Sequence, residues 1–464
     1  MASRATARVN LVVALILLVA AAPQPPAVRA VEESVLREYT GVYQWQPNAF
    51  VYLQLWDEFS GFGKPRQLVA FDESGDVRVL YPTDRDRFFA GPGAAVSTSV
   101  ESRIEFTRDA AGRIVSVTWQ RGNEPLRVAR RVEIERREDV RFASGGLRLA
   151  GTLTSPATAG RHPAVILVHG SGAENRDFIL PWARFLIRRG VAVFGYDKRG
   201  VGESAGDWNA ASFDDLASDV VAAFEYLKTR KDIDPEQIGM IGVSQAGWIM
   251  PLAAVRANGL AFLISISGAG VTAAETTLDQ ARNEMTMAGM PPQAIEEILA
   301  LMKLQYVYAR TGQGWDAYAA AREKVAARMG NPPDTIPGTP DHPYFRFIKQ
   351  IYFYDPAPTL RRLQTPTLAI WGELDNNIVA NKNRDAWQAA LEAGGNRAHT
   401  LVILPKGNHG LFEAKVGSNA EGPTLQRIVP AYFTTVEQWL AKRLRGFRVS
   451  SVARAGSARA SSTS

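Results

Sequence analysis

A serine on a five-residue turn, Gly242-Val243-Ser244-Gln245-Ala246, is the part of this chain best suited to chemistry. The turn follows a short apolar run at 238–241, which predicts a buried strand, and precedes a helical stretch at 248–256. A serine on such a turn exposes its hydroxyl, and the helix N-terminus offers backbone N–H groups to a developing oxyanion. The strict pattern has glycine two residues after the serine, where this chain has Ala246. The turn predicts an acyl-transfer nucleophile, Ser244, which needs a base, an acid and an oxyanion-binding loop.

His409 is the candidate base. It lies in Gly407-Asn408-His409-Gly410, directly after the last predicted core strand at 400–404. Imidazole titrates near neutrality and can accept and return a proton. The chain has four other histidines. His162 precedes a predicted strand, and His169 lies in a predicted oxyanion loop. His342 lies among prolines, and His399 is at the far end of a predicted strand.

Asp375 is the candidate acid. It ends the segment Trp371-Gly372-Glu373-Leu374-Asp375, immediately after a predicted core strand. A buried carboxylate there can bind the second nitrogen of the histidine and favour the imidazolium. Glu373 is the alternative carboxylate, although its place nearer the strand end predicts a different direction.

The predicted oxyanion site uses two backbone N–H groups. Gln245, directly after the serine, supplies one. The other comes from the loop His169-Gly170-Ser171-Gly172, which follows the first long apolar strand. We assign it to the Ser171 amide, with Gly172 as the second choice, and expect His169, Gly170 and Gly172 to support the loop.

A second loop, residues 197–204, follows the next strand and contains two glycines. We expect Asp197 and Arg199 in this loop to hold the mouth of the site rather than to react. No metal or organic cofactor is implied by any of these residues.

The elements that must position these residues alternate between strands and helices from about residue 140 onward. Continuous apolar runs predict strands buried on both faces, at 163–168, 191–196, 238–241, 261–266, 367–371 and 400–404. An alternating segment at 147–153 suits an opening antiparallel hairpin, and Ser212 predicts the start of a helix. The pattern predicts an α/β fold with a mostly parallel sheet, covered by helices on both faces.

One interval, about 271–360, is longer than an ordinary connection and rich in helical segments. We interpret it as a helical cap inserted over the site. Its methionines, leucines and tyrosines could line an acyl pocket or pack within the cap.

Residues 31–137 have a different pattern, in which short alternating runs are separated by turn signals. This predicts a small antiparallel β-domain in front of the α/β domain at 138–449. No catalytic group stands out in it, so a scaffold role is favoured over a ligand-binding or polymer-binding role.

Residues 1–30 have the features of a secretory signal peptide: Arg4 and Arg8, an apolar stretch, and Val28-Arg29-Ala30 as a cleavage site. The apolar stretch is short for a membrane span, although an uncleaved anchor is the alternative. We therefore expect an exported protein, periplasmic or extracellular, without membrane association after cleavage. The tail at 450–464 is predicted to be disordered.

Charge and cysteine content exclude some classes. The leader and the segment after Leu440 contain nine basic residues and no acidic ones, so the formal net charge of +6 becomes −3 for the rest of the chain, and a nucleic-acid partner is not expected. The absence of cysteine excludes disulfides, a lipoprotein anchor and a cysteine nucleophile.

Over about residues 140–447 the chain resembles the α/β-hydrolase superfamily. The segments around 169–172 and 197–200, with Ile233-Asp234-Pro235-Glu236-Gln237-Ile238-Gly239, resemble bacterial esterases related to dienelactone hydrolases and to the prolyl oligopeptidase catalytic domain. The resemblance implies a Ser-Asp-His triad at Ser244, Asp375 and His409. Dienelactone hydrolases themselves use cysteine, which this chain lacks, and the resemblance does not extend to the β-domain.

The sequence thus predicts an exported serine hydrolase that cleaves small-molecule carboxylic esters through an acyl-enzyme. The alternatives are a serine peptidase, for which Glu284, Glu296 or Glu297 could anchor a free amine, an acyltransferase or thioesterase, and a catalytically silent binding protein.

Overall fold

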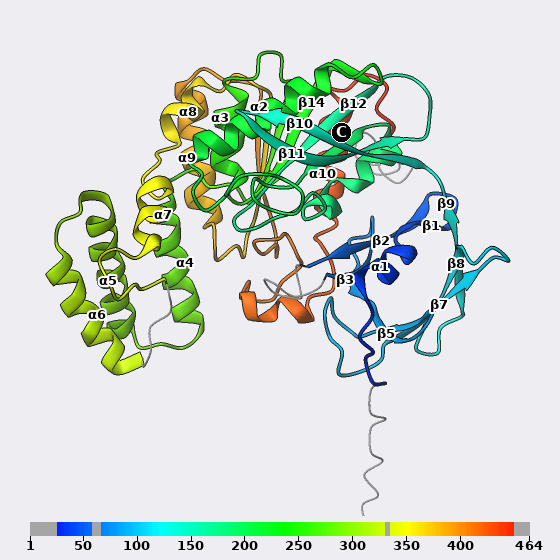
Figure 1. Cartoon of the computed structure of the whole chain (residues 1–464), viewed down its shortest axis with the longest axis horizontal. Coiled ribbons are helices and arrows are strands. Elements are labelled where there is room, and N and C mark those ends of the chain that lie inside the picture. Colours follow the sequence, from blue (N-terminus) through cyan, green and yellow to red (C-terminus); the bar gives the residue numbers. More distant parts are fainter. Residues whose placement is uncertain (1–25, 58–65, 330–334, 450–464) are drawn as a thin grey trace, which may run out of the picture.

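The computed structural model describes residues 26–57, 66–329 and 335–449. They form an N-terminal β-domain, an α/β domain and a lobe of helices, which is seen at the left of Figure 1. The predicted tail and most of the predicted leader lie outside the described residues.

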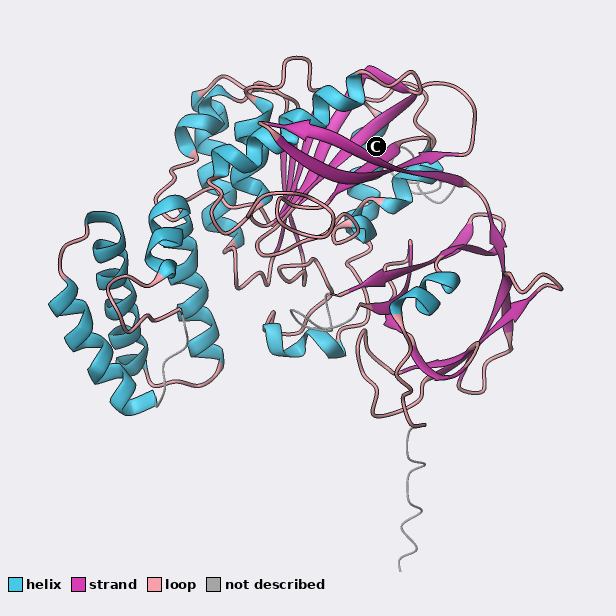
Figure 2. Ribbon diagram, in the orientation of Figure 1, coloured by secondary structure: helices cyan, strands magenta, loops and turns pink. Residues whose placement is uncertain are grey.

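The β-domain is one antiparallel sheet that closes on itself. Its nine strands are β1 (Gly41–Gln46), β2 (Ala49–Trp56), β3 (Gln67–Asp72), β4 (Val77–Val79), β5 (Tyr81–Asp84), β6 (Arg87–Ala90), β7 (Ser102–Arg108), β8 (Ile114–Arg121) and β9 (Arg127–Val132). The order is β4-β3-β2-β1-β9-β8-β7-β6-β5. Only Leu80 separates β4 from β5, so the two edges of the sheet are one continuous segment and the sheet forms the ring seen in Figure 2.

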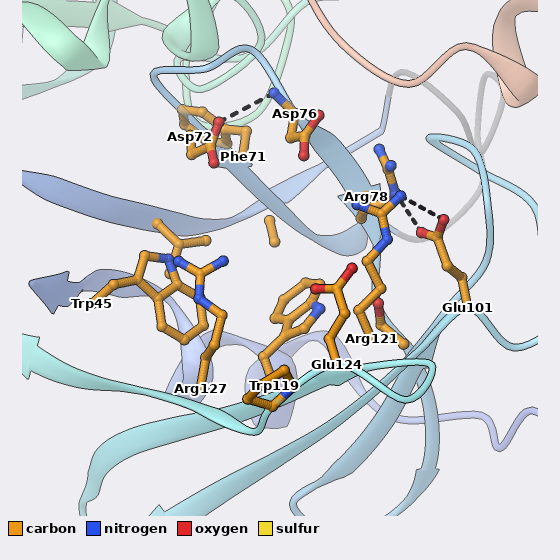
Figure 3. Close-up of a pocket in the computed structure, with 14 residues that line it drawn as sticks. Trp45, Phe71, Asp72, Asp76, Arg78, Glu101, Trp119, Arg121, Glu124 and Arg127 are labelled. Atoms are coloured by element: carbon orange, nitrogen blue, oxygen red, sulfur yellow. Dashed lines mark hydrogen bonds and ion pairs between the residues drawn. The ribbon is translucent and has the colours of Figure 1, made fainter. Parts of the chain in front are cut away.

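The two ends of this ring differ. Helix α1 (Glu33–Leu36) and the short 3-10 helix η1 (Arg37–Tyr39) place Leu36 and Tyr39 in the apolar interior at one end. The opposite end, where β1 and β8 finish, has a cavity of about 110 Å³ lined by Trp45, Trp119 and charged side chains (Figure 3). The two tryptophan rings meet edge to face, and Arg127 stacks on Trp45.

The α/β domain contains an eight-stranded sheet. Its strands are β10 (Glu135–Ser144), β11 (Leu147–Pro156), β12 (His162–Val168), β13 (Ala192–Tyr196), β14 (Ile233–Val243), β15 (Phe262–Ile266), β16 (Thr367–Gly372) and β17 (His399–Leu404). The order is β10-β11-β13-β12-β14-β15-β16-β17; β10 and β11 are antiparallel, and the other six strands are parallel. The predicted architecture, a mostly parallel α/β sheet with a preceding antiparallel β-domain and a helical insertion, is confirmed.

Both faces of this sheet are covered, as the continuous apolar runs predict. On β12, Ala164, Ile166 and Val168 face one core, and Val165 and Leu167 face the other. Four helices cover the first face: α2 (Phe213–Lys228), α3 (Ala246–Ala254), α8 (Ala357–Arg362) and α9 (Ala380–Ala393). The second face is covered by the 3-10 segments η2 (Leu180–Trp182) and η3 (Arg184–Arg189), by α10 (Ala431–Ala441) and by β-domain residues.

The β-domain therefore shares a core with the α/β domain. Trp56 of β2 meets Trp182 edge to face at 5.7 Å. Arg189 forms ion pairs with Glu73 of the β-domain at 3.1 Å and with Glu437 of α10 at 2.9 Å.

The helical lobe, α4 to α7, is inserted between β15 and β16. It consists of α4 (Ala273–Met287), α5 (Pro292–Thr311), α6 (Trp315–Met329) and α7 (Pro343–Ile351). Of the side chains considered for an acyl pocket, Tyr306 packs on Tyr352, and Tyr308 packs on Trp315 inside the lobe. Pro343 begins α7, because the fixed φ of proline suits the first helical position.

Among the described helices, none combines the length and apolar character needed to cross a bilayer.

Candidate active site

Ser244 lies on a strained turn between β14 and α3. Its φ of 57° is in the left-handed region, which is uncommon for a residue with a side chain and recurs at functional sites. The Ser244 N–H donates to the Ile266 carbonyl of β15 at 2.9 Å, and its own carbonyl accepts from Gly247 N–H at 2.8 Å. These bonds hold the turn at the carboxyl edge of the parallel strands, with the serine half-buried.

The glycines around this turn are explained by close approach. A side chain on Gly242 would overlap the Ala246 methyl group, and one on Gly247 would lie 2.6 Å from Gly268 Cα. The alanine that departs from the strict pattern thus fills space that Gly242 leaves empty. Because Ala246 and Gly247 already belong to α3, that helix begins two residues earlier than the sequence predicts.

The structure brings Asp375 and His409 together. His409 Nδ1–H donates to the Asp375 carboxylate, with distances of 2.9 and 3.1 Å to its two oxygens. The Asp375 side chain is fully buried, whereas the His409 ring is 21% exposed. Backbone N–H groups of Asn377 and Ile378 also donate to Asp375 Oδ1, at 2.9 and 2.7 Å. These bonds fix the carboxylate in the position from which it contacts the imidazole.

Glu373, the alternative acid, has a different partner. Its carboxylate accepts the Lys406 N–H at 3.0 Å, at the entrance to the loop that carries His409. Glu373 therefore supports this loop, while Asp375 contacts the imidazole.

The histidine loop, residues 407–413, is fastened to the end of β15. Ser267 Oγ–H donates to the His409 carbonyl at 2.8 Å. Because the residue before it, Ile266, holds the Ser244 N–H, the backbones of Ser244 and His409 are attached to adjacent residues of one strand end. Asn408 Oδ1 closes the loop by accepting the Phe412 N–H at 2.9 Å.

The histidine loop also connects to the β-domain through a short backbone ladder. Glu413 N–H donates to the Arg427 carbonyl at 2.8 Å, and Ile428 N–H donates to the Gly75 carbonyl at 2.8 Å. Arg78 of β4 donates to the Gln426 carbonyl at 2.7 Å, and its side chain lines the cavity shown in Figure 3. Residues 75–78, 426–428 and 411–413 thus form three adjacent segments that link the two domains.

The predicted oxyanion loop, residues 169–172, follows β12. His169 Nε2–H donates to the Tyr196 carbonyl at 2.6 Å, and burial with the nearby Lys198 charge lowers the pKa of His169 to about 3. The imidazole is therefore neutral at physiological pH. Gly170 N–H donates to the buried Glu174 carboxylate at 2.7 Å, and Gly172 has a φ of 90°, which glycine adopts without strain. Ser171, between these glycines, is exposed.

Asp197 and Arg199 hold neighbouring segments in place. Burial raises the pKa of Asp197, but the hydrogen bonds and the charge of Arg176 outweigh burial, so the pKa of Asp197 lies below its ordinary value. The ion pair between Arg176 and Asp197 is 2.6 Å long. Arg199 binds Asp219 of α2 at 2.8 Å. Asp197 thus fastens the segment after the oxyanion loop, whereas Arg199 fastens its own loop to α2.

Sequence reasoning did not single out Lys198. This side chain is 1% exposed, and its ammonium donates to the Gly170 carbonyl at 2.6 Å, the Gly172 carbonyl at 3.0 Å and Gln245 Oε1 at 3.1 Å. In the sequence Lys198 lies between two charged residues, Asp197 and Arg199, and such a lysine is normally solvated. Its burial results from the meeting of three loops in the fold, which has no local signal in the sequence.

No cluster of three or more His, Asp or Glu side chains with metal-binding geometry occurs among the described residues.

Comparison with known proteins gives one family match. Residues 165–417, more than half of the chain, match the model of the Alpha/beta hydrolase family. Esterase EstD of Thermotoga maritima is 24% identical over 56% of this chain and 57% of its own length. Thiohydrolase aneE of Aspergillus aculeatus is 34% identical over 22% of this chain and 32% of its length. The chain spans less than two thirds of the length of either relative.

Solved structures also resemble this chain. An esterase from Thermogutta terrifontis is 17% identical, with a TM-score of 0.39, and the alignment covers 66% of this chain and 98% of that one. A dienelactone hydrolase from Anabaena variabilis is 17% identical, with a TM-score of 0.37, over 68% of this chain and all of that one.

Proposed function

The chain belongs to the Alpha/beta hydrolase family, and from this premise we propose that it is an exported serine hydrolase that cleaves small-molecule carboxylic esters. The observation that carries the proposal is the His409–Asp375 hydrogen bond. It lies at the sheet edge where the strained Ser244 turn is attached. The similarity to an esterase supports the choice of an ester over other acyl substrates.

In the proposed first step, Ser244 Oγ attacks the ester carbonyl carbon while its proton passes to His409 Nε2. Asp375, hydrogen-bonded to Nδ1, stabilises the imidazolium that forms. The carbonyl oxygen becomes an oxyanion and accepts from the Gln245 and Ser171 N–H groups. Collapse of this intermediate expels the alcohol, which takes the proton from His409, and leaves an acyl ester on Ser244.

In the second step, water takes the place of the alcohol. His409 removes a proton from the water, which attacks the acyl carbonyl through a second oxyanion. The carboxylic acid leaves and Ser244 regains its proton. Besides the ester and water, the scheme uses only groups of this chain.

Peptide cleavage is the alternative, and the charges in the helical lobe weigh against an amine anchor there. Glu296 pairs with Arg282, and Glu297 pairs with Arg328. Glu284 accepts from Asn419 at 2.7 Å. Each candidate anchor thus has a protein partner already.

The test is a panel of p-nitrophenyl esters beside aminoacyl anilides, assayed with the wild type, S244A and the control S218A. Ser218 is exposed on α2, so its loss should leave activity unchanged. We expect ester hydrolysis that S244A reduces by at least about 10³-fold. Wild-type rates in S244A would refute the proposal, and cleavage of anilides alone would favour the peptidase.

Export is proposed from the leader sequence. Expression of the full chain, followed by fractionation and N-terminal sequencing, should give a product that begins at Val31 outside the cytoplasm. A cytoplasmic product that retains Met1 would contradict it.

A further inference from the structure

Lys198 is a buried cation beneath the loop proposed to bind the oxyanion. Its three ammonium protons match three oxygen acceptors: the carbonyls of Gly170 and Gly172, and the side-chain oxygen of Gln245. These acceptors flank the two amides assigned to the oxyanion site. Ser171 lies between the two glycines, and Gln245 carries the second amide.

Peptide geometry determines what these contacts do. In a trans peptide the carbonyl of one residue and the N–H of the next point in opposite directions. Since the Gly170 carbonyl is directed at the ammonium, the Ser171 N–H in the same peptide plane is directed away from it. A carbonyl that accepts from a cation is also polarised, which makes the N–H of that peptide a stronger donor.

The groups around Lys198 keep it charged near neutral pH. Burial lowers the pKa of Lys198 to about 8, against the attraction of Glu174, which raises it. The neighbouring His169 is neutral, and the Asp197 carboxylate is paired with Arg176. Nζ also contacts the Gln245 amide of the Ser244 turn and faces the Trp208 ring, whose centroid lies 5.7 Å away.

We propose that Lys198 is the positioning residue of the oxyanion site. It holds the oxyanion loop and the Gln245 side chain together, so that the Ser171 and Gln245 N–H groups face one oxygen. This inference rests on the proposed acyl transfer by Ser244. Lys198 does not touch the substrate, and its effect should be confined to states in which the oxyanion exists.

The principal test is K198M, with K228M as the matched control. Lys228 is a surface lysine on α2, paired with Glu225. We expect K198M to lower kcat for a p-nitrophenyl ester by roughly 10- to 100-fold with little change in KM. Inhibition by phenylboronic acid, which forms a tetrahedral adduct on serine, should weaken by a similar factor. K228M should match the wild type in both measurements.

The pH profile gives a readout that a purely structural role would not move. In the wild type, kcat should decline as the pH rises through about 8, where Lys198 loses its proton. Folded K198M should lack this decline. If K198M does not fold, K198Q and the wild-type pH profile test the role of Lys198 instead. K198Q retains a hydrogen-bond donor without the charge and should show the same loss of kcat.

Unchanged kcat and boronate inhibition in folded K198M or K198Q, or a wild-type kcat that is flat from pH 7 to 9, would overturn the role of Lys198. If S244A retains full activity, the proposed function itself fails. The two failures are therefore distinguishable.

Discussion

On the oxyanion side of the candidate site, one buried ammonium contacts three oxygens of the α/β domain, whereas on the histidine side a backbone ladder continues into the N-terminal β-domain. The first arrangement is compact and depends on one charge. The second depends on peptide groups from segments that lie more than 300 residues apart, such as Gly75 and Ile428. The two sides should therefore respond to different perturbations: charge and pH on the oxyanion side, and backbone changes in the β-domain on the histidine side.

The largest loss of activity is expected when the carboxylate that contacts His409 is replaced. D375N removes the charge that stabilises the imidazolium and allows the wrong histidine tautomer, so we expect kcat to fall by about 10⁴-fold. Steady-state kinetics with a p-nitrophenyl ester measure it. A fall of less than tenfold in the folded variant would remove Asp375 from the mechanism.

The next effect concerns the acid sensitivity of the oxyanion side. Burial and, to a smaller extent, the charge of Lys198 lower the pKa of His169 from 6.5 to about 3. Between pH 3 and pH 6.5, His169 is therefore protonated in the unfolded state and neutral in the folded state. The free energy of unfolding should consequently fall as the pH falls below 6.5, by up to about 1.4 kcal/mol per pH unit. H169Q should remove this contribution. Denaturation measured from pH 4 to 8 checks it, and parallel curves for the two proteins would contradict it.

A substitution in the β-domain should displace the histidine loop and lower activity. Gly75 has a φ of 94°, and a methyl group there would overlap the Ile428 carbonyl oxygen. We expect G75A to lower stability by about 1–3 kcal/mol and kcat by roughly 10-fold, because the ladder displaces the histidine loop.

The matched control is G112A. Gly112 has a φ of 79° in the same domain, and a methyl group there would meet nothing within 4 Å. If both variants lose stability but neither loses kcat, the ladder does not position His409.

The smallest effect on activity is expected at Glu373, and it distinguishes the role of this carboxylate from that of Asp375. E373Q should change kcat by less than about threefold, since the amide oxygen can still accept the Lys406 N–H and no contact to the imidazole is altered. A loss as large as that of D375N would reverse the assignment of the acid.

Much of this arrangement could be predicted from the sequence because the strands are continuous apolar runs. Each candidate group, from Ser171 to His409, directly follows such a run, and the carboxyl ends of parallel strands meet at one edge of a sheet. The fold class follows from the same alternation.

Other features depend on contacts between distant segments and have no local signal. Alternation predicts the strands of the β-domain, but not that β9 pairs with β1 or that Leu80 joins the two edges. The burial of Lys198 results from loops after three different strands, and the ladder from residue 75 to residue 428 joins two domains.

The central claim is that Ser244 forms the acyl-enzyme. It is tested most directly by peptide mass spectrometry after treatment of the full chain with a fluorophosphonate. We expect one adduct, on the peptide that contains Ser244, in the wild type and in S218A, and none in S244A. An adduct on another residue, or wild-type labelling of S244A, would contradict it.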